Sequence, residues 1–116
     1  MKHIEFVNPV GLVGRFVTVR LGDKWLSRLS QGDKVQLTGP SGESCGVAAA
    51  ADIWNGDLAL VPGSLLEMEH DPLCRTYSGL VMGLRCAYRD AVIEPGSNVT
   101  VIVLDLVAPS SILRVK

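Results

Sequence analysis

Apolar and polar positions alternate with a period of two in two short stretches of the first third of the chain. In residues 16–20, Phe16, Thr18 and Arg20 share one face and two valines share the other. Residues 34–38 alternate in the same way after a Gly-Asp pair. The pattern predicts two strands, the first of which carries a hydroxyl and a guanidinium on one face.

Further strands are expected in the middle and near the end of the chain. An alanine-rich stretch ends at Asn55-Gly56, a pair that suits the backbone of a tight hairpin turn. We therefore expect 49–54 to pair with 58–61. Residues 99–106 are apolar on both faces, which is typical of a strand covered on both sides. This stretch is the predicted core strand.

Three helix starts are indicated by polar residues of the kind that accept hydrogen bonds from the first amides of a helix. Asp23 is placed to cap a short helix that follows it, and Ser64 with Glu67 forms a capping-box pattern. Ser78 is placed to cap a third helix, in which two leucines, a valine and Tyr88 fall at helical spacing.

These elements follow one another as β-α-β-β-β-α-α-β in a chain of 116 residues, with no internal repeat and no linker. We therefore predict a single domain over residues 1–116, of the α+β class. Short strands around a small core favour a compact, partly open β-barrel with two or three short helices that close its ends.

Composition and charge narrow the classes of function. The net charge of −1 argues against a protein that grips nucleic-acid phosphates over a broad face, so any such contact is local. No apolar run approaches the length of about 20 residues that spans a bilayer. The N-terminus also lacks the apolar core of a signal peptide. We expect a cytoplasmic protein without membrane contact.

Metal and redox chemistry have little support in the sequence. The three cysteines are odd in number and contain no C-x-x-C pair, which indicates free thiols. Segment 69–74 holds residue types that bind metals, but Pro72 interrupts it and no second ligand cluster occurs. We expect no metal and no cofactor.

Several motifs stand in a characteristic order. The first motif, residues 13–20, ends in Thr18-Val19-Arg20. The motifs that follow it are Gly32-Asp33-x-Val35, the predicted helix through Tyr88 and the predicted strand from Val99 to Ile102. This order resembles the ASCH family, a branch of the PUA-like barrels found in RNA-associated and nucleoside-processing proteins, and the likeness covers residues 12–106. Against the family motif Gly-x-Lys-x-x-Glu-x-Arg, Arg20 is kept, Arg15 replaces the lysine, Thr18 replaces the glutamate and the glycine is displaced to Gly14.

The resemblance implies a PUA-like fold and a site for RNA or a nucleotide-like ligand. Family members that hydrolyse acylated cytidine carry threonine at the glutamate position, with the motif lysine and a later glutamate. By this likeness Thr18 is a candidate nucleophile, and Glu69 or Asp71 is the later carboxylate. Arg15 cannot serve as a base, because a guanidinium with a pKa above about 12 does not shed its proton. We expect it to hold an anion instead.

The candidate ligand-binding residues combine basic and hydroxyl side chains of one strand and the following helix with a carboxylate opposite; they are Arg15, Thr18, Arg20, Lys24, Arg28 and Glu69. A guanidinium fork suits a phosphate or a base edge. Trp25 or Tyr88 either stacks on a nucleobase or belongs to the core. Lys24 and Arg28 are alternatively a solvated helix face.

Three functions from different classes are compatible with these residues. The leading one is a binding domain that recognises RNA or a nucleotide-like ligand in a polar, basic cleft between strand 15–20 and segment 67–71. The alternative is an amidohydrolase acting on an acylated, N4-acetylcytidine-like nucleoside, in which Thr18 attacks, Glu69 or Asp71 moves the proton and Arg15 stabilises the oxyanion. The third is a protein-interaction domain whose cleft is vestigial. We expect a monomer or a weak dimer.

Overall fold

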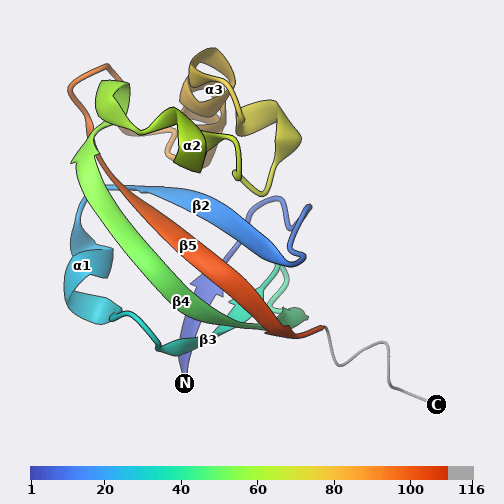
Figure 1. Cartoon of the computed structure of the whole chain (residues 1–116). Helices are drawn as coiled ribbons and strands as arrows, with labels where there is room; N and C mark the ends of the chain where they lie inside the picture. Colours follow the sequence, from blue (N-terminus) through green and yellow to red (C-terminus); the bar gives the residue numbers. More distant parts are fainter. Residues whose placement is uncertain (110–116) are drawn as a thin grey trace.

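The computed structural model describes residues 1–109, in which five strands are accompanied by short helices (Figure 1). In chain order the elements are β1 (Lys2–Glu5), β2 (Arg15–Leu21), α1 (Lys24–Arg28), β3 (Lys34–Thr38), β4 (Ser44–Asp57), the 3-10 helix η1 (Leu58–Leu60), α2 (Gly63–Leu66), the 3-10 helix η2 (Pro72–Cys74), α3 (Tyr77–Ala87) and β5 (Asn98–Ala108). The strands β2, β3 and β5 and the helix α1 lie where the pattern of apolar positions predicts them.

The five strands form one mixed sheet in the order β1-β3-β4-β5-β2. Strand β1 runs parallel to β3, whereas all other neighbouring pairs are antiparallel. The register of β4 against β5 shifts at Val47/Ala48 and again at Ala50/Asp52. Such bulges bend a strand and increase its twist, and Figure 1 shows β4 and β5 curving together across the molecule.

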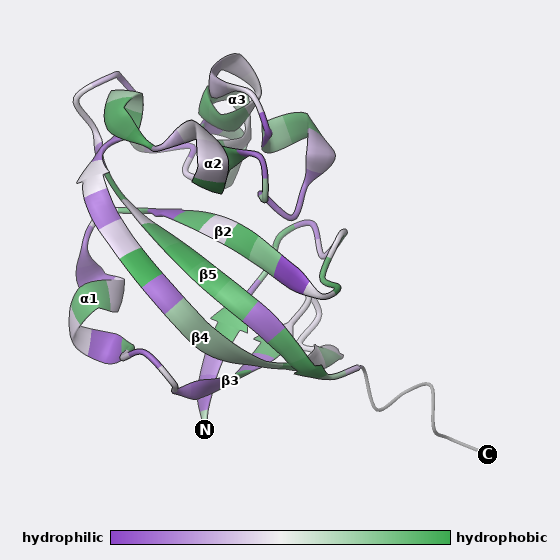
Figure 2. Cartoon of the chain, in the orientation of Figure 1, coloured by the Kyte–Doolittle hydropathy of each residue, from purple (hydrophilic) through white to green (hydrophobic). Residues whose placement is uncertain are grey.

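Strand β5 is the core strand that the sequence predicts. It pairs with β4 on one side and with β2 on the other. Its residues 99–104 are all buried, and Ile102 and Leu104 pack in the core on one face of the sheet. Val101 and Val103 pack on the opposite face. Figure 2 shows this apolar run as a green band along β5.

The predicted hairpin at Asn55-Gly56 is wrong. Strand β4 continues through both residues and pairs them with Thr100 and Val99 of β5, while residues 58–60 form η1. The Asn55 amide Nδ2 donates to Thr100 Oγ1 at 3.1 Å, so its side chain stabilises the strand pair. At Gly56 the absence of a side chain leaves room for the Trp54 ring, because a Cβ there would lie 2.8 Å from that ring. Packing and hydrogen bonds therefore override the turn preference of this pair.

The sheet does not close into the barrel that we predicted, because β1 and β2 remain separate edge strands. The sequence pattern missed β1, whose single buried side chain, Ile4, lies among exposed neighbours. The contact between the edge strands β1 and β2 is made by a side chain, where a closed barrel would have backbone hydrogen bonds. Arg20 Nη1 donates to the Glu5 carbonyl oxygen at 2.7 Å, and the guanidinium lies over the Phe6 ring. The fold is thus a compact α+β arrangement around an open, curved sheet.

Helices cover both faces of the sheet. Trp25 and Leu29 from α1 and the turn after it join one core with Phe6 and Phe16, so Trp25 is a core residue. On the other face, α3 buries two leucines, Leu80 and Leu84, against the valines of β2 and β5. Within residues 1–109 no helix has the length and apolar character needed to cross a membrane.

The three predicted helix caps do not form, although helices begin close to each of them. Thr76, not Ser78, caps α3, because its Oγ1 accepts from the Gly79 amide at 3.1 Å. Helix α2 begins at Gly63 after Pro62, so Ser64 lies inside its first turn and no capping box forms. Asp23 precedes α1 without a side-chain hydrogen bond to it.

Candidate functional site

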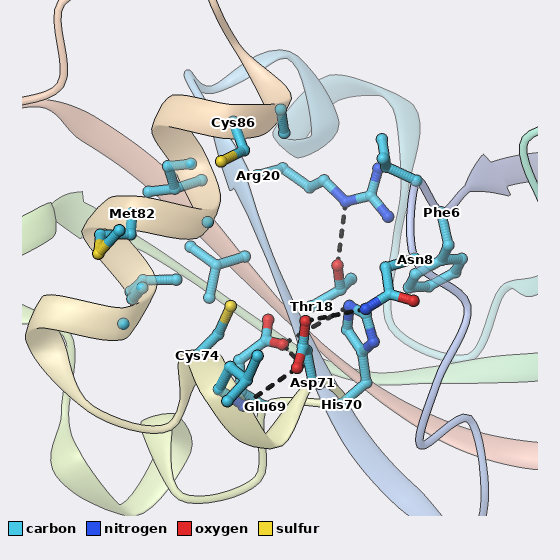
Figure 3. A pocket seen from close by; sticks show the side chains of 18 of the residues that line it. Phe6, Asn8, Thr18, Arg20, Glu69, His70, Asp71, Cys74, Met82 and Cys86 are labelled. Carbon is cyan, nitrogen blue, oxygen red and sulfur yellow. Dashed lines mark hydrogen bonds and ion pairs between the residues drawn. The ribbon is translucent and has the colours of Figure 1, made fainter.

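A cavity of about 560 Å³ lies along the outer edge of β2, between the segment after β1, segment 69–74 and α3 (Figure 3). Its polar lining comes from β2, segment 69–71 and Asn8, whereas α3 and the turn before it supply mainly apolar or small side chains. The lining residues are Phe6, Val7, Asn8, Thr18, Val19, Arg20, Glu69, His70, Asp71, Leu73, Cys74, Gly79, Leu80, Met82, Gly83, Leu84, Cys86, Ala87 and Tyr88.

The free edge of β2 builds this cavity. Along β2, the amides of the odd-numbered residues point away from β5. The Val17 amide donates to the Met68 carbonyl oxygen, and the Val17 carbonyl oxygen accepts from the His70 amide. This short parallel bridge places Glu69 beside the strand. The Val19 amide hydrogen bonds with the Glu69 carboxylate. At the end of β2 the Leu21 amide donates to the Tyr88 hydroxyl at 3.3 Å.

Glu69 is the buried acid of the cavity, with only 3% of its surface exposed. Burial raises the pKa of its carboxyl to about 7, against the opposing effect of hydrogen bonds from the Asp71 and Val19 amides. The Asp71 amide donates to Oε1 at 2.9 Å. The Arg20 charge also acts to lower this pKa, but Arg20 makes no salt bridge with the carboxylate. Within residues 1–109, the basic group at salt-bridge distance is the His70 imidazole, whose Nε2 lies 3.5 Å from Oε1. The carboxyl therefore changes its charge near neutral pH.

His70 is buried next to Glu69 and lies edge-on to the Phe6 ring, with ring centroids 4.9 Å apart. Its Nδ1 is 2.9 Å from the Val10 carbonyl oxygen, and because a carbonyl only accepts, Nδ1 must carry a proton. Burial lowers the pKa of the imidazole, so the neutral ring is favoured. The unprotonated Nε2 then faces Glu69 Oε1 at 3.5 Å.

Arg20 and Thr18 form the other polar pair of the cavity. Arg20 Nε donates to Thr18 Oγ1 at 3.0 Å, and the guanidinium carbon lies 4.8 Å from the centre of the Phe6 ring. Burial lowers the pKa of Arg20 from its ordinary value, but an arginine stays protonated at physiological pH. Thr18 is only 2% exposed. Because arginine accepts no hydrogen bond, the Thr18 hydroxyl proton does not point to Arg20.

The cavity mouth combines one polar contact with exposed apolar side chains. Asn8 Nδ2 donates to Asp71 Oδ2 at 3.1 Å and so joins the segment after β1 to segment 69–71 (Figure 3). Three apolar side chains of the lining, Val7, Leu73 and Met82, are largely exposed. The mouth therefore favours an occupant that covers apolar surface while its polar part reaches Arg20 and Glu69.

The structure brings together three of the six predicted binding residues. Thr18, Arg20 and Glu69 line one cavity, and Asp71, the alternative carboxylate, lies at its mouth. Glu69, not Asp71, is the buried acid.

The other three predicted residues lie outside this cavity. Arg15 is exposed and makes a two-pronged pair with Asp105, at 2.8 and 2.9 Å. Lys24 is exposed on α1, and Arg28 extends over the Trp25 ring beside a separate groove. The Arg15 position follows from strand parity, which points it away from the Thr18 face.

Sequence reasoning did not select Phe6, Asn8 or His70 as site residues. Phe6 and Asn8 belong to an irregular segment without a periodic pattern, and they reach the cavity only through the packing of that segment. His70 directly follows the predicted carboxylate Glu69 in the sequence, and this adjacency could have indicated that His70 lies at the site. For Tyr88 the sequence left two alternatives, stacking on a nucleobase or a place in the core; its side chain packs against the core and also lines the cavity.

A metal centre receives no support from the described part of the chain. No group of three or more histidine, cysteine or acidic side chains within residues 1–109 is arranged to hold a metal ion. The three cysteines, Cys45, Cys74 and Cys86, are free thiols, as the sequence predicts.

Comparisons with known proteins extend to the fold alone. No protein-family model and no curated protein sequence matches the chain. Among solved structures, the crystal structure of protein EF3133 from Enterococcus faecalis V583, of family DUF984, superposes with a TM-score of 0.70. The match covers 98% of this chain and 80% of that protein, at 11% sequence identity. This chain therefore shares its fold with a DUF984 protein.

Proposed function

We propose that this chain is a small binding domain that takes a nucleobase, carried by a nucleoside or by single-stranded RNA, into the cavity along β2. The observation that carries the proposal is the meeting of the Arg20 guanidinium and the buried Glu69 carboxyl in one cavity of about 560 Å³ with apolar walls. A size of about 300–1,000 Å³ with few convergent polar groups is typical of small-molecule sites.

The chemistry of the cavity suits the edge and the faces of a base. Every base presents hydrogen-bond donors and acceptors side by side on its edge. Glu69 accepts from an amino group, and Arg20 donates to a ring nitrogen or carbonyl. The half-buried Tyr88 ring and the exposed side chains of Leu73 and Met82 supply apolar surface for the faces of the base.

Recognition of one base agrees better with the charge of the chain than a broad phosphate-binding face does. The net charge is −1, and three of the four predicted basic residues, Arg15, Lys24 and Arg28, lie outside the cavity. Membership of the PUA-like ASCH family is part of this proposal. It is supported by the motif residues Thr18 and Arg20 facing the later carboxylate Glu69.

Titration of the protein with the four ribonucleosides and with short single-stranded RNAs, followed by amide NMR shifts, tests the proposal. We expect at least one base to shift the amides of residues 18–20 and 69–71. Arg20→Lys should weaken the effect, because an ammonium lacks the fixed fork with which the guanidinium holds Thr18 and Glu5 and also donates to the base. Arg28→Ala, outside the cavity, is the matched control and should bind as the wild type does. A free nucleoside that binds as well as the RNA identifies a small-molecule site. Absence of binding to all of them at millimolar concentration contradicts the proposal.

Hydrolysis of an acylated nucleoside is a second candidate, favoured by the 3.0 Å contact of Arg20 Nε with Thr18 Oγ1. In this scheme Thr18 Oγ attacks the acyl carbon and its proton passes to the Glu69 carboxylate, which then protonates the leaving amine. Water hydrolyses the resulting ester. Arg20 replaces Arg15 as the cation near the oxyanion, since Arg15 is paired with Asp105 outside the cavity.

Incubation with N4-acetylcytidine distinguishes the two candidates. Release of cytidine that is abolished by Thr18→Val and retained by Arg28→Ala supports hydrolysis. Binding without turnover supports the binding domain alone.

A further inference from the structure

We propose that Glu69 engages its ligand as a neutral carboxylic acid, so that the cavity selects an uncharged base edge with an acceptor beside a donor and binding takes up a proton. The inference deepens the proposed function and rests on it. It concerns which base the cavity takes and how pH regulates that choice.

The first step is the setting of the carboxyl. Glu69 is 3% exposed, and its fixed partners are the amides of Val19 and Asp71. Arg20 faces the same cavity but is bonded to Thr18 and to the Glu5 carbonyl, and it makes no salt bridge with Glu69. A buried carboxylate without a contacting cation is costly, and a ligand that displaces the remaining water raises that cost. An uncharged occupant therefore favours the protonated acid.

The second step is the hydrogen-bonding capacity of the acid. A carboxylic acid presents one O–H donor and one carbonyl acceptor side by side, whereas a carboxylate only accepts. Cytosine and adenine each place a ring-nitrogen acceptor next to an amino donor, which matches the acid with two hydrogen bonds. The guanine edge places two donors side by side and so matches the carboxylate. The protonation state thus decides between the two kinds of edge.

The third step concerns the other charged and titratable groups around Glu69. They are Arg20 on β2, His70 and Asp71 on its own segment, Cys74 and Arg75 at η2, and Cys86 and Tyr88 at the end of α3. Burial lowers the pKa of His70, so the imidazole stays neutral above pH 7, and burial raises the pKa of Cys74 to about 11. The Asp71 charge raises the pKa of Glu69, and the Arg20 charge lowers it. With the carboxyl pKa at about 7, Glu69 loses its proton between pH 6 and pH 9.

The experiment measures the dissociation constants of cytidine, adenosine and guanosine at pH 6, 7, 8 and 9 by calorimetry. We expect the affinity for cytidine or adenosine to fall tenfold per pH unit above the pKa of Glu69, roughly a hundredfold between pH 6 and pH 9. At pH 8 the heat should vary with the ionisation enthalpy of the buffer, in proportion to the uptake of nearly one proton. The guanosine affinity should not fall over this range.

Two variants isolate the carboxyl. Glu69→Gln presents an amide that always has a donor and an acceptor, so its affinity for cytidine or adenosine should be independent of pH. Glu67→Gln, which changes an exposed acid outside the cavity, should keep the pH dependence of the wild type.

The outcomes separate the two proposals. Binding of cytidine or adenosine that does not weaken from pH 6 to pH 9 overturns this inference and leaves the proposed function standing. The same holds if Glu69→Gln keeps the wild-type pH dependence, or if guanosine alone binds. If none of the three nucleosides nor single-stranded RNA binds at any of these pH values, the proposed function fails and this inference fails with it.

Discussion

Arg20 Nη1 donates to the carbonyl oxygen of Glu5 at 2.7 Å and so joins the two edge strands of an open sheet. The same guanidinium lies over the Phe6 ring and holds the Thr18 hydroxyl. The Arg20 side chain therefore lines the cavity and also links the two edges of the sheet. A residue of this kind affects ligand binding and stability together when it is changed.

We expect Arg20→Ala to lower the free energy of unfolding by about 2–3 kcal/mol, because charge-assisted hydrogen bonds and a packed guanidinium are lost from a buried position. It should also abolish nucleoside binding. Urea unfolding measures the first effect. The sequence indicated Arg20 only as a candidate ligand-binding residue, and the hydrogen bond to the Glu5 carbonyl oxygen adds the effect on stability.

Arg15→Ala is the matched control for Arg20→Ala. Its pair with Asp105 is exposed, and exposed ion pairs contribute little. We expect unfolding and nucleoside binding close to those of the wild type. An Arg15→Ala variant that loses binding while Arg20→Ala retains it would refute our assignment of the binding guanidinium.

A charge in the middle of β5 should abolish folding. Ile102 has no exposed surface and lies in the core between β2 and β4. An unpaired buried carboxylate costs several kcal/mol, against a total stability of about 5–15 kcal/mol for a domain. We expect Ile102→Asp to be insoluble or to lack a cooperative thermal transition in circular dichroism, whereas Ile102→Val should keep one. A variant that melts as the wild type does would contradict the buried placement of this strand.

The success of the strand predictions and the failure of the turn prediction have a common cause. The alternation in β2 and the continuous apolar run in β5 both reflect burial, which stabilises these strands, whereas Asn-Gly reflects only a local backbone preference. At Asn55 that preference is outweighed by hydrogen bonds with β5, and Gly56 pairs with Val99 of the same strand.

The sequence predicted the part of the candidate site that lies on a single strand, β2. Thr18 and Arg20 share a face because of strand parity, which also directs Arg15 away from them. Glu69 is 49 positions beyond Arg20 and joins it only through the bridge to Val17, which no local pattern encodes. It was found through the family resemblance, which left Asp71 as an equal alternative until burial separated the two.

Glu69 should make stability depend on pH in a defined direction. A carboxyl whose pKa rises from 4.5 to about 7 on folding favours the folded state below pH 4.5, and this contribution is lost as the pH rises through 7. The lowered pKa of His70 acts in the opposite direction at acidic pH, so the wild type alone is ambiguous. The difference between wild type and Glu69→Gln isolates the carboxyl.

We expect Glu69→Gln to gain stability relative to the wild type as the pH rises from 5 to 8, by about 3 kcal/mol at most. Urea unfolding at four pH values measures this difference. Glu67→Gln, at an exposed position, should show no such trend. A difference between Glu69→Gln and wild type that stays constant over this range would show that Glu69 does not titrate there.

A methyl group at Gly83 on α3 should stabilise the protein only when the Cys74 side chain is shortened. A Cβ at Gly83 would lie 2.7 Å from Cys74 Sγ, so Gly83→Ala forces the sulfur to move. Alanine is otherwise the better helix residue by about 1 kcal/mol. We therefore expect Gly83→Ala to be neutral or destabilising in the wild type and stabilising by about 1 kcal/mol in the Cys74→Ala background. A double-mutant cycle of unfolding free energies measures the coupling directly, and equal effects of Gly83→Ala in both backgrounds would contradict the contact.

Because Gly83 and Cys74 both line the cavity, the same variants should also change nucleoside affinity, which connects the packing of α3 with the binding site.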